Sequence, residues 1–327
     1  MELKLEITKK LEDIRDSLDN SIAILNLPAA NLCEKRTEMV RAADGGLEQA
    51  CKGCISQNIK IGERLPIGKL KEIVDFFSED YQTRFLTING RGNPFHPSLK
   101  KETLDKIAYA SSRGIQSYVF TAGTNLDEGT CKRLAEHKAN VMISLFGNKF
   151  IDEDFFKGKR YPSAREPLQN QAKIVRNLRM LIKTYVSSSP GKGITRIGMN
   201  YVISESDMED ESKVRLLKEA ANRNGVFLIC NTNFLPHPNQ KIRKRMQDIA
   251  IKHSNFHLRH STYVNGRCQM GAGSSATVDY NGELYRCPYM DGKGDGKFQE
   301  LSENQIKRVL SRYMKDRKYA CVLRRTG

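Results

Sequence analysis

The sequence predicts an α/β fold in which helices pack against a parallel β-sheet. Two observations predict it. Short apolar runs rich in β-branched residues alternate with longer amphipathic segments over roughly residues 20–236, and two of these segments end in glycine just before the next run. Glycine commonly ends a helix, and strands that alternate with helices form right-handed βαβ units around a parallel sheet. A third observation marks a boundary, because the final stretch of the chain is richer in glycine and cysteine.

Each element follows from its local pattern. Residues 1–20 place leucine and isoleucine at helical spacing among alternating charges, which predicts a short amphipathic helix. Six apolar runs predict strands at 22–27, 84–89, 117–122, 140–145, 196–203 and 226–231. Between them, apolar residues at three- and four-residue spacing predict helices at 65–81, 99–114, 124–138, 167–186 and 211–225. Residues 276–287 predict a hairpin that turns at Asn281 and Gly282.

Composition narrows the class of protein. The chain of 327 residues is 39% hydrophobic and 28% charged, as expected for a soluble protein. It has no apolar run long enough to span a membrane and no signal peptide at its start, so we expect a cytoplasmic protein without a membrane partner. The formal net charge of +16 fits either a solvated basic surface or an anionic partner. Without an RGG tract, zinc-finger spacing or RNP motif, specific nucleic-acid binding is not indicated.

The eight cysteines suggest metal or cluster chemistry. In a chain of this length without an export signal, thiolates that bind a metal are favoured over disulfides. The cysteines fall into an early group, a late group and two isolated residues: Cys33, Cys51 and Cys54; Cys268, Cys287 and Cys321; Cys131 and Cys230. Cys131 falls within a predicted amphipathic helix, where we expect it to pack in the core.

The early cysteines and a glycine-rich turn are predicted to meet. Active sites of parallel α/β folds lie at the carboxyl ends of the strands. Cys33, Cys51 and Cys54 follow the first predicted strand, and the segment GRGNPFHP, residues 90–97, follows the second. Three thiolates suit a [4Fe–4S] cluster with one iron left open to another ligand. A structural zinc site at Cys51 and Cys54 is the competing interpretation, although zinc usually takes four protein ligands.

In its order of motifs, the chain resembles the radical S-adenosylmethionine (radical SAM) enzymes. That family carries CxxxCxxC after the first barrel strand, GGEP after the second, TNG after the third and SLDG after the fourth. Here the corresponding segments are the three early cysteines, residues 90–94 (GRGNP), 121–123 (TAG) and 144–147 (SLFG). The resemblance covers about residues 20–240. It implies a partial (β/α)6 TIM-like barrel with a small cysteine-containing C-terminal extension.

The resemblance also implies a cofactor site. Cys33, Cys51 and Cys54 would bind a [4Fe–4S] cluster whose open iron takes S-adenosyl-L-methionine. The residues implied to bind the cofactor lie in the turns and strands just described: Gly90, Arg91, Gly92, Asn93, Thr121, Ser144 and Asn200.

This chain differs from the family patterns in spacing and at three motif positions. Residues 34–50 separate Cys33 from Cys51, a much longer spacing than in CxxxCxxC. Asn93 stands where the family has a glutamate whose carboxylate usually receives the methionine amino group. Ala122 replaces the asparagine of TNG, and Phe146 replaces the aspartate of SLDG.

The C-terminal region resembles the SPASM and twitch extensions of the same superfamily, which hold auxiliary clusters. The similar features are Cys268 and a hairpin in which Gly282 precedes Cys287, with Cys321 as a third ligand. The number of cysteines fits a single, twitch-like cluster. A small zinc site completed by His257 or His260 is the alternative. The resulting division is an N-terminal helix at 1–20, a radical SAM barrel at 21–240 and an auxiliary-cluster domain at 241–327.

Cys230, at the end of the last predicted strand, has three open roles. It could be an auxiliary-cluster ligand, a hydrogen-atom donor in catalysis, or a small buried residue. Its neighbours Asn231, Asn233 and His237 could line a substrate pocket, although loop polarity explains them equally well.

The resemblance implies an oxidoreductase-type enzyme. Such an enzyme cleaves S-adenosylmethionine reductively and uses the 5′-deoxyadenosyl radical to abstract a hydrogen atom. The compact chain and basic charge favour a small polar or phosphorylated substrate, such as a sugar, aminocyclitol or nucleotide derivative, and oxidation or epimerisation as the outcome. A reductant such as flavodoxin or ferredoxin is implied.

Two other functions remain open. One is a peptide-modifying maturase, although only about twenty residues precede the first predicted strand, so we expect no separate leader-binding domain. The other is a zinc-stabilised nucleic-acid-binding protein, which would contain zinc without iron and bind in a strongly salt-dependent manner.

Overall fold

The fold is built around one large, mostly parallel sheet. The computed structural model describes residues 4–13, 21–37, 39–41, 47–49, 54, 63–145, 169–186, 194–203, 211–232, 240–253, 256–257, 263–264, 267–268, 273–288 and 294–315. The nine strands of the sheet follow the order β11-β10-β9-β7-β6-β5-β2-β14-β15. The six predicted strands form its centre and are confirmed: β2 (Ile24–Asn26), β5 (Phe85–Ile88), β6 (Gln116–Thr121), β7 (Asn140–Ser144), β9 (Ile197–Ile203) and β10 (Phe227–Thr232). Each pairs in parallel with its neighbour, so their carboxyl ends meet at one edge.

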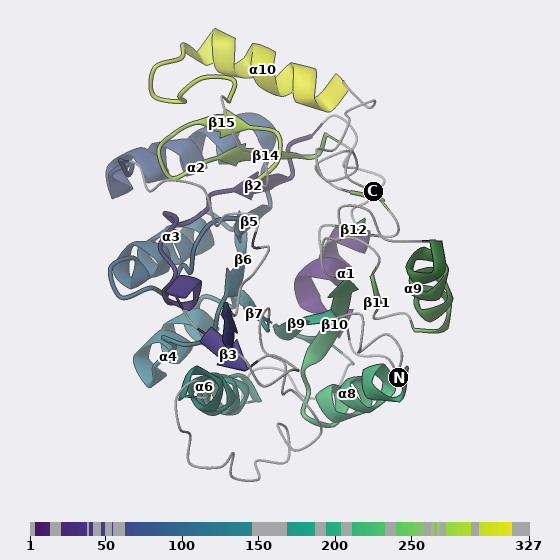
Figure 1. The fold of residues 1–327 in the computed structure, drawn as a ribbon. Coiled ribbons are helices and arrows are strands. Elements are labelled where there is room, and N and C mark those ends of the chain that lie inside the picture. The colour runs from purple at the N-terminus through teal and green to yellow at the C-terminus, as the bar shows by residue number, and fades with distance from the viewer. Residues whose placement is uncertain are drawn as a thin grey trace.

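The predicted helices connect these strands. They are α2 (Ile67–Tyr81), α3 (Lys100–Ser112), α4 (Glu128–Glu136), α6 (Gln169–Val186) and α8 (Glu211–Arg223). The first four lie side by side along one face of the sheet (Figure 1). The local sequence explains where α4 begins. Asp127 is its N-cap residue, and its side chain accepts a hydrogen bond from the Thr130 amide at 2.7 Å.

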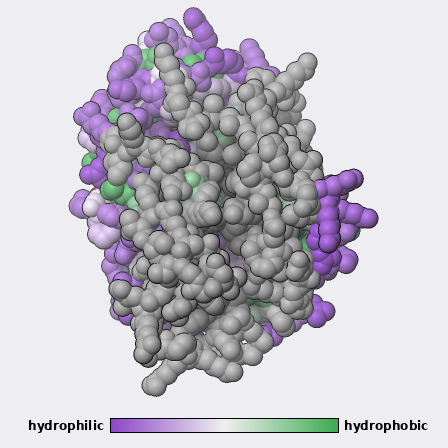
Figure 2. All heavy atoms as spheres, viewed as in Figure 1, coloured by the Kyte–Doolittle hydropathy of each residue, from purple (hydrophilic) through white to green (hydrophobic). Residues whose placement is uncertain are grey.

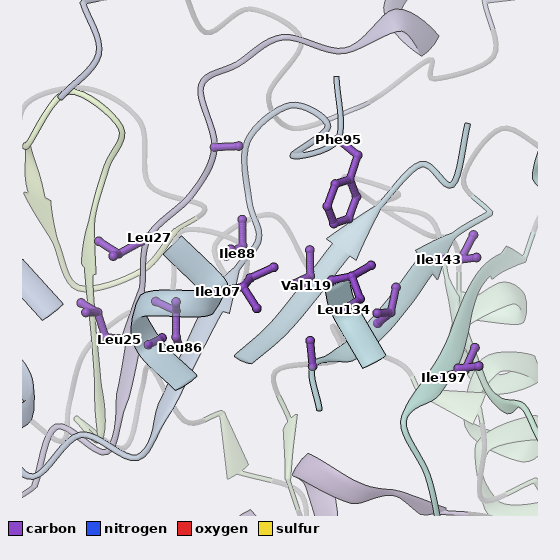
Figure 3. Close-up of a cluster of buried hydrophobic side chains, with 14 of the residues drawn as sticks. Leu25, Leu27, Leu86, Ile88, Phe95, Ile107, Val119, Leu134, Ile143 and Ile197 are labelled. Carbon is purple, nitrogen blue, oxygen red and sulfur yellow. The ribbon is translucent and has the colours of Figure 1, made fainter. Parts of the chain in front are cut away.

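The main hydrophobic core lies between the sheet and these helices. Side chains alternate between the two faces of a strand, and on β5 Leu86 and Ile88 are almost fully buried on the helix side. Figure 3 shows them beside Ile107 of α3 and Val119 of β6. Because both faces of the central strands are covered, apolar residues occur on both faces, with polar residues mainly near the strand ends.

The opposite face of the sheet is covered by the N-terminus. The predicted helix over 1–20 begins later than expected, because a short strand, β1 (Lys4–Leu5), precedes α1 (Glu6–Asp13). Residues 14–20 lie outside the described part of the chain. β1 pairs in parallel with β8 (Ile194–Thr195). Leu5 and Ile7 are buried there beside Phe85, Tyr118 and Met142, in a second cluster that fills the inside of the partial barrel.

The C-terminal region continues the same sheet. β14 (Ser275–Val278) pairs in parallel with β2, and β15 (Leu284–Tyr285) returns antiparallel to β14, which confirms the predicted hairpin. Gly282 has φ +89°, a left-handed conformation that suits glycine in this turn. Two short antiparallel pairs lie outside the large sheet: β3 (Met39–Arg41) with β4 (Leu47–Gln49), and β12 (Tyr263–Val264) with β13 (Arg267–Cys268).

Five elements in the described part of the C-terminal region were not predicted: α9 (Gln240–Lys252), β11 (Phe256–His257), the β12–β13 pair and α10 (Glu303–Lys315). In Figure 2 hydrophilic side chains gather over α9 and around α10. Among the described residues, no helix is long and apolar enough to cross a membrane.

Candidate active site

The candidate site lies where β2, β5 and β6 end. After β2 the chain runs through Cys33 into a short 3-10 helix, η2 (Glu34–Thr37). After β5 it forms the GRGNP turn, and after β6 it forms a turn that contains Gly123. These three segments are far apart in sequence, and parallel pairing of the strands brings them together.

Cys33 and Cys54 lie near each other at this edge. Both are partly exposed. Burial raises the pKa of the Cys33 thiol to about 11, and the charges of Glu34 and Cys54 add to the rise. The thiol is therefore protonated at neutral pH in the metal-free chain, and a bound cation would displace the proton. Cys51 lies outside the described residues, so the third member of the predicted ligand set is untested.

The GRGNP turn packs directly on the Cys33 loop. A Cβ added at Gly92 would lie 2.4 Å from the Ala30 carbonyl oxygen and 2.5 Å from that of Leu32, so only glycine fits. The Asn93 amide donates to the Leu32 carbonyl at 2.6 Å. This contact fixes the turn against the loop that carries the first cysteine.

Asn93 connects all three strand ends. Its Oδ1 accepts a hydrogen bond from the Thr121 hydroxyl at 2.8 Å, with the Ala122 and Phe95 amides both at 3.4 Å. Its Nδ2 donates to Glu34 Oε1 at 2.7 Å. Asn93 and Thr121, both predicted to bind the cofactor, are thus buried and joined to each other.

Glu34 is a site residue that sequence reasoning missed. Besides Asn93, the Thr124 hydroxyl and the Asn125 amide donate to its Oε1, the latter at 3.0 Å. Its other oxygen, Oε2, is buried and has no hydrogen-bond partner among the described residues. One signal could have indicated it, namely a carboxylate directly after Cys33 in a chain that lacks the expected carboxylate at position 93.

The other two turn residues contact the C-terminal region. Arg91 donates from Nε to Asp279 Oδ2 at 3.1 Å, and the side chains are only 3% and 6% exposed. A Cβ added at Gly90 would lie 2.7 Å from the Pro288 Cβ. These contacts hold the β14–β15 hairpin against the turn. They do not test the predicted contact of Gly90 and Arg91 with the cofactor, which remains a prediction.

Ser144 and Asn200 are neighbours on adjacent strands. They are paired in register between β7 and β9, so their side chains emerge on the same face of the sheet. Both are half-buried. The structure therefore places these two predicted residues together, one strand beyond the Asn93–Thr121 group.

The late cysteines are only partly described. Cys287 is buried two residues after the end of β15 and precedes Pro288, which packs against Gly90. Cys268 is the last residue of β13, but the structure does not describe its side chain. Cys321 lies outside the described residues. Within the described part of the chain, no three histidine, cysteine or acidic side chains are grouped as metal ligands. The auxiliary-cluster ligand set therefore stays a prediction.

Cys230 does not face the inside of the barrel. Its neighbour Ile229 belongs to the inner hydrophobic cluster, whereas Cys230 is fully buried in the cluster between sheet and helices. Of its three predicted roles, this position favours packing. Cys131 of α4 is buried in the same cluster, and burial raises the pKa of its thiol to about 12.

Comparison with known proteins shows that the chain shares its fold with several solved structures. No protein-family model and no curated protein sequence matches the chain. The solved structure of Streptococcus suis SuiB bound to the precursor peptide SuiA is 12% identical, and the match covers 96% of this chain and 71% of SuiB with a TM-score of 0.56. Native anSMEcpe with bound AdoMet is 15% identical, and the match covers 86% of this chain and 80% of that chain with a TM-score of 0.57. These similarities confirm the predicted partial-barrel α/β fold.

Proposed function

We propose that the chain is a radical SAM enzyme. The observation that carries the proposal is the assembly at the ends of β2, β5 and β6, where the Cys33 loop, the GRGNP turn and Thr121 are joined through Asn93. Polar groups at the carboxyl ends of parallel strands are typical of an active site. The solved radical SAM enzymes SuiB and anSMEcpe share this fold, and the latter is known with AdoMet bound.

The residues present fit a [4Fe–4S] cluster with S-adenosylmethionine. Cys33 and Cys54 offer two neighbouring thiols of the type that holds iron–sulfur clusters, and Cys51 would be the third ligand. The bound cluster would supply the electron that starts radical chemistry on S-adenosylmethionine. The chain's own part is to bind and orient this cofactor and to keep water and competing hydrogen donors away. Buried Asn93 and Thr121 would form the rigid edge of its pocket, and Ser144 and Asn200 would orient groups on the inner face.

We also propose an auxiliary cluster in the C-terminal region, held by Cys268, Cys287 and Cys321. Its support is that β14 and β15 extend the barrel sheet next to β2, which brings Cys287 close to the GRGNP turn. Such a cluster would accept an electron from the substrate and so favour net oxidation.

The substrate proposal keeps two candidates. A small polar or phosphorylated molecule fits the basic net charge of the chain. A peptide is favoured by a different observation, because the SuiB structure that matches 96% of this chain is bound to a precursor peptide. A flavodoxin- or ferredoxin-type reductant and a cytoplasmic location complete the proposal.

The test is formation of 5′-deoxyadenosine by the anaerobically reconstituted chain with S-adenosylmethionine and dithionite. We expect product from the wild type and from Cys131→Ala, whose cysteine is buried in the hydrophobic core between the sheet and the helices. We expect none from Cys54→Ala. Equal product from Cys54→Ala and the wild type, or none from the wild type, would contradict the proposal.

A further inference from the structure

The position expected to carry a negative charge in the candidate site carries none. Asn93 occupies the place of the carboxylate in the GRGNP turn, and its amide cannot balance the charge of an ammonium group. Its Oδ1 is already used by the Thr121 hydroxyl at 2.8 Å. A cationic group bound here therefore needs a carboxylate from elsewhere in the chain, because a buried charge is costly unless it is paired.

Glu34 brings a carboxylate to the same place. It reaches Asn93 from the neighbouring strand end, with 2.7 Å between Asn93 Nδ2 and Glu34 Oε1. Thr124 and Asn125 also donate to Oε1, so this oxygen is held from three sides. The side chain is thus fixed beside position 93, although it is 59 residues away in sequence.

The second oxygen of Glu34 is available for a ligand. Oε2 is buried, and no group in the described part of the chain forms a hydrogen bond with it. A buried acceptor without a partner is costly, and the cost is larger for a charged group. A primary ammonium group has three donors and a positive charge, so it would satisfy both the hydrogen bonding and the charge of this oxygen.

We propose that Glu34 is the residue that receives the amino group of the methionine part of S-adenosylmethionine, in place of the missing carboxylate at position 93. This inference rests on the proposed function. In this arrangement Asn93 is a positioning residue, because it donates to Oε1 and leaves Oε2 directed to the ligand. The carboxylate has moved from the turn after β5 to the residue that follows the first cysteine.

The test compares ligand affinities of the reconstituted full-length chain by equilibrium dialysis. Glu34→Gln keeps the shape and the Oε1 acceptor but removes the charge. We expect it to bind S-adenosylmethionine about ten- to a hundredfold more weakly, as for the loss of one charged hydrogen bond. Its affinity for 5′-methylthioadenosine, which lacks the amino acid part, should stay the same. Glu63→Gln, which removes an exposed carboxylate, should leave both affinities unchanged.

A charge-relocation variant separates ligand binding from a structural role. Glu34→Gln combined with Asn93→Glu puts a carboxylate back at the turn, and we expect it to recover most of the lost affinity for S-adenosylmethionine. Iron content is measured for every variant. Unchanged affinity in Glu34→Gln would overturn this inference and leave the proposed function standing. An equal loss for both ligands without recovery in the double variant would assign Glu34 a structural role. A wild-type chain that binds iron but no S-adenosylmethionine would overturn both.

Discussion

Asp279→Asn should destabilise the chain strongly, because it removes a buried carboxylate that forms an ion pair with the buried side chain of Arg91. Arg91 and Asp279 are 3% and 6% exposed, so water cannot replace the lost carboxylate. The asparagine can still accept the Tyr280 amide hydrogen bond at Oδ1, so the change is mainly electrostatic. The charge of Asp279 also affects buried Lys106. Burial lowers the pKa of this lysine, and the negative charges of Glu102 and, to a smaller extent, Asp279 raise it again.

Removing one partner of a buried ion pair costs about 3–5 kcal/mol. With a urea m-value of about 3 kcal/mol/M, the unfolding midpoint should fall by about 1–2 M. Circular dichroism can follow the transition, since the chain has no tryptophan. The matched control is Glu128→Gln, which breaks an ion pair with Lys132 whose side chains are 69% and 67% exposed. It should leave the midpoint unchanged. If Asp279→Asn shifts the midpoint no more than Glu128→Gln does, the reasoning about this buried pair is wrong.

Three further predictions follow from single residues. Gly92→Ala should prevent stable folding of the turn, because φ at this residue is +33° and the added Cβ would collide with backbone atoms. Gly68→Ala in α2 is the control: its added Cβ meets no atom within 4 Å, so this variant should raise the melting temperature slightly. Asp127→Ala should lower the free energy of unfolding by about 1 kcal/mol, because it removes the N-cap of α4. The Lys100 ammonium and the Thr130 donors lower the pKa of Asp127 from its usual range to about 2. This stabilisation should therefore be lost as the pH falls from about 4 to about 2. Burial raises the pKa of the Cys131 thiol to about 12, so in the metal-free protein this neutral thiol should stabilise the folded state below pH 9 and lose that effect as the pH rises towards 12. Over this pH range the urea midpoint of Cys131→Ala should therefore fall less than that of the wild type.

The central strands and helices could be predicted because their local patterns agree with their burial. On β5 and β6 apolar residues fill both faces, and glycine at 114 and 225 ends the segments before β6 and β10. α10 carried a readable signal that was overlooked, since its buried residues Ile306, Leu310 and Tyr313 have helical spacing. The start of the N-terminal helix was misplaced because the leucine and isoleucine spacing of residues 1–20 is helical overall, whereas Leu5 pairs as a strand with Thr195.

The sequence could predict only those parts of the site that come directly after a strand. Parallel strands bring their carboxyl ends together, so Cys33 and the GRGNP turn were expected to meet, whereas Thr121 was implied by the family resemblance. Contacts across long separations leave no pattern in a single sequence. Neither the Arg91–Asp279 pair nor the hydrogen bond from Asn93 to Glu34 has a local signal. The direction of Cys230 likewise depends on strand register, which its flanking residues do not specify.

The most direct test of the proposed radical SAM function is the iron and sulfide content after anaerobic reconstitution, measured on the wild type and on a variant with Cys33, Cys51 and Cys54 all changed to alanine. We expect about eight irons per chain in the wild type and about four in the variant, as for two [4Fe–4S] clusters. About four falling to none would keep the radical chemistry and remove the auxiliary cluster. Zinc without iron in both proteins would contradict the account and favour the zinc-stabilised alternative.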